Sequence, residues 1–407
     1  MIRFQMSSLA VLFVLSLGLG ANGQIAIKGD KVYPIAAAVI ENGVVLVGKD
    51  GKIEAVGSAS SIKIPDGYRV LQGKVVTPGL IDGRSVVGLA GQYNRNQDQE
   101  QHEKSAPIQA ELRALDAYNY RETLVTWLRE HGVTTVNTGH APAALISGQS
   151  MIVKTTEAPI EKTVLKKTAM VLATLGDGGR ARGGKAPGTR AKQVALLRAE
   201  LVKAKEYAAK LVSAKDDKKP SRDLGLETLA LVLAGKVPLL VTANRDRDIL
   251  TALRVGREFS IKIILDGAAE IHQVLEEVKK AGVSVILHAP MVRATGEREN
   301  ASWATAAKLA KAGIPFTLQS GYESYVPKTR VVLFEAAIAA ANGLGFEKAL
   351  RVITLDAAKI LGIEKRVGSL EVGKDGDVVV FDGDPFEYTS HVTGVVIDGV
   401  VVSSVKR

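Results

Sequence analysis

The stretch Val75-Val76-Thr77-Pro78-Gly79-Leu80-Ile81-Asp82-Gly83-Arg84-Ser85-Val86 decides how the chain folds. It begins as a short apolar run, which suits a buried strand. Pro78-Gly79 interrupts the run, as expected where a linker enters a new domain. The stretch therefore predicts a strand that opens a domain and ends in polar residues.

Between about residues 76 and 365, helical and strand patterns alternate. Four helical stretches end in glycine directly before an apolar run, at Gly132, Gly235, Gly282 and Gly313. Glycine permits a left-handed helix cap, and the apolar runs are typical of buried parallel strands. With the runs at 75–81, 169–175 and 261–265 this gives seven strands, and Met151 to Lys154 is a candidate eighth. The sequence thus predicts an α/β fold with a (β/α)₈ TIM-like barrel.

The two ends of the chain are rich in short strands and turns. Residues 24–75 contain hairpin signals at Glu41-Asn42-Gly43 and at Lys49-Asp50-Gly51-Lys52. Residues 366–407 contain two more β-rich runs. We therefore expect both termini to form one small composite β-sandwich domain.

The first 23 residues have the pattern of a signal peptide. Arg3 supplies positive charge, Leu9 to Leu19 is apolar, and Ala21-Asn22-Gly23 offers small residues for cleavage. A membrane span needs roughly 20 apolar residues, so this run is too short. We expect an exported protein, periplasmic or secreted and not membrane-spanning, with an uncleaved N-terminal anchor as the alternative.

Charge and cysteine content narrow the function classes. The chain has no cysteine, which excludes disulfides and thiolate metal sites. Its net charge is +10, and residues 180–222, within a basic insertion at about 176–222, hold thirteen Lys or Arg against four acids, a net of +9. This segment could contact an anionic surface, or it could simply be a solvated helix and loop. Nucleic acid is not expected, because no aromatic stacking pattern accompanies the charge.

Two motifs resemble those of the amidohydrolase superfamily. Pro78-Gly79-Leu80-Ile81-Asp82 resembles the start of the V-x-P-G-L-I-D-x-H-x-H signature of the first barrel strand. Residues 349–362 and 368–380 are similar to the A-L-x-x-x-T-x-x-x-A-x-x-L-G and G-x-L-x-x-G-x-x-A-D-[LV] ending. The resemblance runs from about residue 30 to the end, is nearest to the imidazolonepropionase-like branch, and implies a hydrolase of non-peptide carbon–nitrogen bonds.

The resemblance also implies a metal centre that activates water, held by histidines, a lysine and an aspartate at the strand ends. Five of those ligand positions hold other residues here: Arg84, Val86, Thr242, Gly267 and Gly321. A guanidinium keeps its proton and valine has no donor atom, so no cofactor is expected by the family pattern. Lys154 is the candidate for the family's lysine, with an exposed surface lysine as the alternative.

Six further polar residues fall at predicted strand ends: Asp82, His140, Asn244, Arg245, Asp266 and His288. Strand-to-helix loops build the functional face of a barrel, so these are the candidate catalytic and binding residues. Two histidines and an aspartate suffice for zinc, which makes His140, His288 and Asp266 the core of a rearranged mononuclear site. Structural histidines are the competing interpretation. Arg84 is expected to pair with Asp82 or Asp266, or to hold a substrate carboxylate.

Two functional hypotheses follow. The first is an exported, degenerate family member, a pseudoenzyme without the family metal, that binds a small-molecule ligand at the barrel mouth. The second is an active hydrolase with the rearranged metal site. The sequence leaves open whether the protein is an enzyme.

Overall fold

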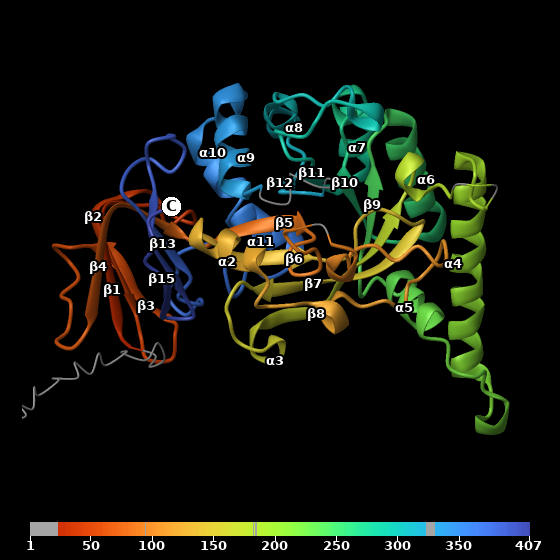
Figure 1. Ribbon diagram of the computed structural model, residues 1–407, viewed down its shortest axis with the longest axis horizontal. Helices are drawn as coiled ribbons and strands as arrows, with labels where there is room; N and C mark the ends of the chain where they lie inside the picture. Colours follow the sequence, from red (N-terminus) through yellow and green to blue (C-terminus); the bar gives the residue numbers. More distant parts are fainter. Residues whose placement is uncertain (1–22, 94, 182, 184, 323–329) are drawn as a thin grey trace, which may run out of the picture.

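The computed structural model describes residues 23–93, 95–181, 183, 185–322 and 330–407, and its strands form two sheets (Figure 1). Residues 1–22 of the predicted signal peptide lie outside the described part of the chain. Among the described residues, no helix combines the length and the apolar character needed to cross a bilayer.

The larger sheet has eight strands in the order β12-β11-β10-β9-β8-β7-β6-β5. They are β5 (Leu80–Ser85), β6 (Val133–Thr138), β7 (Ile146–Lys154), β8 (Val164–Thr174), β9 (Leu239–Ala243), β10 (Ile263–Gly267), β11 (Ser284–Leu287) and β12 (Phe316–Leu318). Strands β12 and β5 contact each other, so the sheet is a nearly closed barrel. The predicted α/β barrel is confirmed at this level.

One strand departs from the predicted parallel repeat. Strand β7 runs antiparallel to both of its neighbours, β6 and β8, while the other adjacent pairs are parallel. Parallel neighbours need a crossover of a dozen or more residues, whereas residues 139–145 make only a short link between β6 and β7. The run at 75–81 is also divided, because Val75 to Pro78 belong to the other sheet and the barrel strand starts at Leu80.

Helices surround the barrel (Figure 1). They are α1 (Ala114–Ala117), α2 (Thr123–Glu130), α3 (Ile160–Thr163), α4 (Arg190–Ser213), α5 (Leu224–Leu233), α6 (Asp246–Phe259), α7 (Leu275–Ala281), α8 (Thr305–Ala312), α9 (Val332–Ala339), α10 (Phe346–Val352) and α11 (Leu355–Leu361). All four glycines predicted to end helices have positive φ angles, between 64° and 82°. Left-handed backbone favours glycine, so these positions mark the strand starts reliably.

Alternate residues along the strands separate the barrel interior from the layer beneath the helices. Ile81, Leu240, Ile264 and Ile286 pack in one apolar cluster with Ala357, Ala358 and Leu361 of α11. Their neighbours Leu80, Val241 and Leu265 join the larger cluster that includes the surrounding helices. An apolar plug thus fills the interior and α11 packs against it.

The smaller sheet combines strands from both ends of the chain, in the order β15-β14-β13-β4-β1-β2-β3. Its strands are β1 (Ile25–Val32), β2 (Ile40–Val47), β3 (Ile53–Ser58), β4 (Arg69–Pro78), β13 (Val378–Phe381), β14 (Val392–Ile397) and β15 (Val400–Ser403). Strands β4 and β13 pair antiparallel, with Thr77 opposite Val379. A separate composite β-sandwich domain with boundaries at residues 75 and 366 stays a prediction.

A buried lysine joins the two sheets. The Lys154 ammonium group donates hydrogen bonds to Asp375 at 2.7 Å, Asp377 at 3.0 Å and Asp398 at 2.5 Å, and its side chain is 1% exposed. Burial alone would lower the pKa of Lys154, but the charges of Asp377, Asp398 and Asp375 outweigh it and raise the pKa. Lys154 is therefore buried against the C-terminal segment and does not line the cavity at the barrel mouth. Both predictions for it, an exposed surface lysine and a family lysine at the barrel mouth, differ from this position.

Replacing this lysine should destabilise the fold. Lys154→Met leaves the buried Asp377 without its cation, while Asp375 keeps Lys52 and Arg366, so we expect the free energy of unfolding to fall by about 3–5 kcal/mol in urea titrations. The control is Lys167→Met, at an exposed position on β8, which should change stability little. A loss below about 1 kcal/mol for Lys154→Met would contradict the importance of this contact.

Candidate functional site

A cavity of about 560 Å³ opens at the carboxyl ends of the parallel barrel strands, and we call it the mouth cavity. Its walls come from the ends of β5, β8, β9 and β10 and from the segments that follow β5, β6, β8, β9, β11 and β12. Functional sites of barrels are built on this face, because the strand-to-helix loops meet there.

The structure brings most of the predicted site residues to this cavity. All five positions that the resemblance assigns to metal ligands line it: Arg84, Val86, Thr242, Gly267 and Gly321. Asn244, Asp266 and His288 line it as well. Four candidates are not among the lining residues: Asp82, His140, Lys154 and Arg245.

Arg84 is held by the backbone, not by a carboxylate. Its Nη1 donates to the carbonyl oxygens of Ser85 at 2.6 Å and Gly139 at 3.1 Å, and its Nη2 donates to the carbonyl of His140. The ion pairs formed by the described residues include none between Arg84 and Asp82 or Asp266, so the predicted pair is wrong. Burial lowers the pKa of Arg84, but a guanidinium stays charged near neutral pH. A fixed positive charge therefore lies at the end of β5.

Asp82 is buried on β5 and bridges this strand to the segment after β12. One carboxylate oxygen accepts the backbone N–H groups of Arg84 at 3.1 Å and Ser320 at 3.0 Å, and the other accepts the Ser320 hydroxyl. These contacts join β5 to the segment after β12. Burial raises the pKa of Asp82 to about 6, although the hydrogen bonds from Ser320 and Arg84 oppose the shift.

Asp266 lies at the end of β10 and accepts two side-chain donors. Its carboxylate accepts the Thr242 hydroxyl and the Gln319 amide, the latter at 2.7 Å. Gln319 also donates to the carbonyl of Ile286 at 2.9 Å. Thr242 therefore acts here as a hydrogen-bond donor at the position where the family pattern expects histidine.

His288 presents an unpaired nitrogen at the cavity wall. Its Nδ1 lies 2.8 Å from the carbonyl oxygen of Ala289, which can only accept, so Nδ1 carries the proton. Burial lowers the pKa of His288 to about 4, which keeps the ring neutral at pH 7. The Nε2 atom of His288 is a buried acceptor with a free lone pair. Within the described part of the chain it has no hydrogen-bond partner.

A second unpaired acceptor lies on the same wall. The buried Asn244 Oδ1 has no hydrogen-bond partner among the residues that the structure describes. It lies close to Gly267, where an added Cβ atom would be 2.7 Å from this oxygen. With the Asp266 carboxylate, the mouth cavity thus offers three acceptor groups.

His140 lies apart from these groups. Its Nδ1 approaches Gly148 on β7, since a Cβ atom added there would be 3.0 Å away. Burial and, to a lesser extent, the charge of Arg84 lower the pKa of His140 to about 4. Over the described ranges, no three His, Cys, Asp or Glu side chains are grouped so that they could hold a metal ion. The structure therefore does not bring His140, His288 and Asp266 together as a rearranged site.

The residues at the five family ligand positions do not fit a metal centre of the family type. Gly267 and Gly321 have φ angles of +76° and +71°, a left-handed backbone that L side chains rarely adopt. Histidine or aspartate at those positions would strain the backbone. Arg84 adds a positive charge that repels a cation, and Val86 offers no donor atom.

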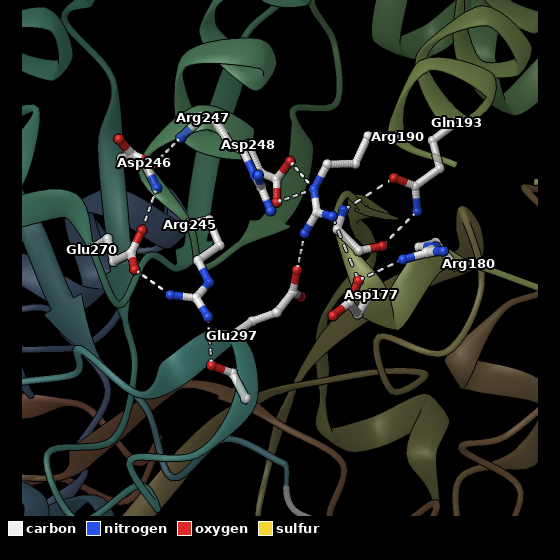
Figure 2. Close-up of polar contacts among 12 residues, drawn as sticks. Asp177, Arg180, Arg190, Gln193, Arg245, Asp246, Arg247, Asp248, Glu270 and Glu297 are labelled. Carbon is white, nitrogen blue, oxygen red and sulfur yellow. Dashed lines mark hydrogen bonds and ion pairs between the residues drawn. The ribbon is translucent and has the colours of Figure 1, made fainter. Parts of the chain in front are cut away.

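Two arginines hold the rim of the cavity, and Figure 2 shows their contacts. Arg245 donates to Glu270 and to Glu299, both at 2.7 Å, and to the carbonyl of Gly296 at 2.9 Å. In this structure Arg245 is therefore engaged with residues at the rim, and a role for it in binding stays a prediction.

The second arginine, Arg190, was missed by sequence reasoning. It begins α4, donates to Asp248 at 2.9 and 3.0 Å, and pairs with Glu297. Glu297 lines the mouth cavity and belongs to the short turn Gly296–Arg298. Only the start of a helix after a glycine-rich loop hinted at Arg190, because its hydrogen-bond partners Asp248 and Glu297 lie more than fifty residues away in the sequence. Gln319 and Ser320 were also missed, although both follow the last strand.

Comparisons with known proteins agree with this architecture. A family model described as "Amidohydrolase family" matches residues 268–403. An imidazolonepropionase from Symbiobacterium thermophilum is 34% identical over 109 residues, which cover 26% of this chain and 25% of that protein. An imidazolonepropionase from Fusobacterium nucleatum is 26% identical over 126 residues, 30% of each chain. The matched region thus spans only about a quarter to a third of these relatives.

One solved structure matches almost the whole chain. An amidohydrolase from Thermotoga maritima MSB8 superposes with a TM-score of 0.87 at 29% identity, over 94% of this chain and 100% of that chain. The likeness therefore includes the barrel and the sheet made from both ends.

The buried carboxyl of Asp82 predicts a pH-dependent stability. Its folded pKa of about 6 lies above the unfolded value near 4, so the folded state binds more protons between these pH values. Stability from this group is therefore lost as pH rises through that range. From pH 4 to pH 7, the free energy of unfolding should fall by about 2 kcal/mol more in the wild type than in Asp82→Asn.

Urea titrations at several pH values check this. The exposed Asp66→Asn variant is the matched control and should follow the wild-type profile. Parallel profiles for wild type and Asp82→Asn would show that Asp82 does not titrate in this way.

Proposed function

Because the chain belongs to the amidohydrolase superfamily, we propose that its barrel mouth binds a small molecule without the family's metal centre. Support comes from the place of the five substituted ligand positions, which all line the mouth cavity. The protein is then hydrolase-like by descent and has lost the site that would hydrolyse carbon–nitrogen bonds.

The polar groups of the mouth cavity favour a ligand rich in hydrogen-bond donors. His288 Nε2 and Asn244 Oδ1 are buried acceptors without partners among the described residues, and the Asp266 carboxylate lies on the same wall. An unpaired buried acceptor is costly, and a ligand N–H group would satisfy it. A volume of about 560 Å³ suits a small molecule. Small cyclic amides and ureides carry the required donors.

Catalysis by a rearranged mononuclear metal site is the alternative, with zinc as the candidate ion. It would need His140 and His288 to move toward Asp266, since the described residues include no such group of ligands.

Export is also part of the proposal. It rests on the charge and apolar pattern of residues 1–23, which predicts a periplasmic or secreted protein.

Metal analysis separates the two functions. The full chain is expressed in a bacterium and recovered from the periplasm, and its mass shows whether residues 1–23 were removed. We expect cleavage near Gly23. We also expect far less than one zinc, iron or manganese ion per chain, because the mouth cavity lacks the set of metal ligands. About one tightly bound ion per chain that is lost in His288→Ala would contradict the metal-free function. An uncleaved chain in the cytoplasm would contradict export.

Ligand binding at the mouth is tested with hydantoin and dihydrouracil, whose ring N–H groups are donors. We expect binding by calorimetry, and His288→Leu should weaken it at least about tenfold, because the Nε2 acceptor is lost.

The matched control is His131→Leu. His131 is as buried as His288 but does not line the mouth cavity, so its loss should leave affinity unchanged. Equal affinity in wild type and His288→Leu would show that the probes do not bind at this wall.

A further inference from the structure

The helix α4 begins at the rim of the mouth cavity and lies on the side of the barrel away from the small sheet (Figure 1). Arg190, its first residue, pairs with Glu297 at the rim of the mouth cavity. The helix has 24 residues, which corresponds to about 36 Å at 1.5 Å per residue. Figure 1 shows its carboxyl end and the loop that follows extending beyond the rest of the barrel. We call residues 210–219 the α4 tip.

The α4 tip is not packed against the barrel. The buried residues of α4 are Gln193, Leu197, Leu201, Ala204 and Tyr207. Tyr207 is the last of them, and its hydroxyl contacts Asp223 and Glu227 at the start of α5. The final turns of the helix therefore carry no buried side chain, and their surface is available to a partner.

The basic residues of α4 and of the loop after it differ in their partners. Arg190, Arg198 and Lys203 form ion pairs with acidic residues, whereas the ion pairs of the described residues include none for Lys192 or Lys205. At the tip, Lys210, Lys215 and Lys218 are exposed. The ion pairs that the described residues form include none for these three lysines. The α4 tip also holds Lys219, Asp216 and Asp217, so its four lysines and two aspartates give a net charge of 4 − 2 = +2.

An apolar side chain lies among these lysines. Val212 is 89% exposed, although it belongs to the last turn of the helix. A single exposed valine is ordinary on a protein surface. Placed at a projecting end between lysines, it fits the pattern of a contact with a lipid interface, where an apolar group enters and cations meet the headgroups.

We propose that the α4 tip docks the protein on an anionic lipid bilayer. Lys210, Lys215 and Lys218 contact the headgroups and Val212 enters the interface. Because the rim of the mouth cavity lies at the other end of α4, the α4 tip can contact a bilayer without covering the mouth. This inference does not depend on which ligand binds in the mouth cavity. It assigns the contact with an anionic surface, expected for residues 180–222, to the α4 tip alone.

Vesicle sedimentation tests the proposal. Full-length protein is mixed with vesicles of phosphatidylglycerol and phosphatidylcholine, or of phosphatidylcholine alone, at 0.1 M NaCl. The apolar run Leu9 to Leu19 could itself bind lipid, so neutral vesicles measure that background and all variants keep the same N-terminus. We expect specific binding to the anionic vesicles, and 0.5 M NaCl should weaken it.

Two variants should weaken this binding. The triple variant Lys210→Glu, Lys215→Glu, Lys218→Glu should lose at least about 30-fold in affinity, because each lysine near an anionic surface contributes substantially. Val212→Ser should lose about threefold, since less apolar surface enters the interface.

The control reverses three exposed lysines elsewhere, Lys279, Lys280 and Lys311, with the same change in net charge. It should retain affinity within about twofold. Equal losses in both triple variants would show a general charge effect and overturn the proposal. Undiminished vesicle binding by the triple variant at the α4 tip would also overturn the proposal. So would a Val212→Ser variant that changes the oligomeric state but leaves the affinity for vesicles unchanged.

Discussion

The mouth of this barrel depends on a buried guanidinium whose hydrogen bonds go to the backbone. Arg84 donates to the carbonyls of Ser85, Gly139 and His140, and so joins the end of β5 to the loop after β6. A buried charge is costly unless it is well hydrogen-bonded, and three carbonyl acceptors meet that need. The same arrangement leaves a positive charge where the superfamily places metal-binding histidines. Beside this charge, the mouth cavity is lined by the acceptor groups of His288, Asn244 and Asp266.

The remaining polar groups serve two distinct purposes. Asp82 and Lys154 hold the fold together, since Asp82 links β5 to the segment after β12 and Lys154 links the barrel to the C-terminal strands. His288, Asn244 and Asp266 face the mouth cavity, and the first two keep acceptor atoms without partners in the described part of the chain. Unsatisfied buried acceptors are uncommon in folded proteins, and a bound water, ion or ligand can satisfy them.

Much of the architecture was predictable from residue types. The four helix-ending glycines located strand starts correctly, because left-handed backbone is a local requirement. The direction of β7 was not predictable, since its apolar run has no pattern that distinguishes a parallel from an antiparallel strand. The five residues that the resemblance places at ligand positions line the mouth cavity, and their assignment as ligand positions stays a prediction. The roles of Arg84 and Lys154 could not be read from sequence, because their partners are backbone carbonyls and distant aspartates that only the fold brings near.

We propose that the mouth cavity binds its ligand without a metal. Crystals grown with zinc, measured for anomalous scattering on both sides of the zinc absorption edge, test this most directly. The account predicts no anomalous peak within the mouth cavity, and Arg84 still bound to its three carbonyls. A strong zinc peak next to His288 Nε2 and the Asp266 carboxylate would contradict it.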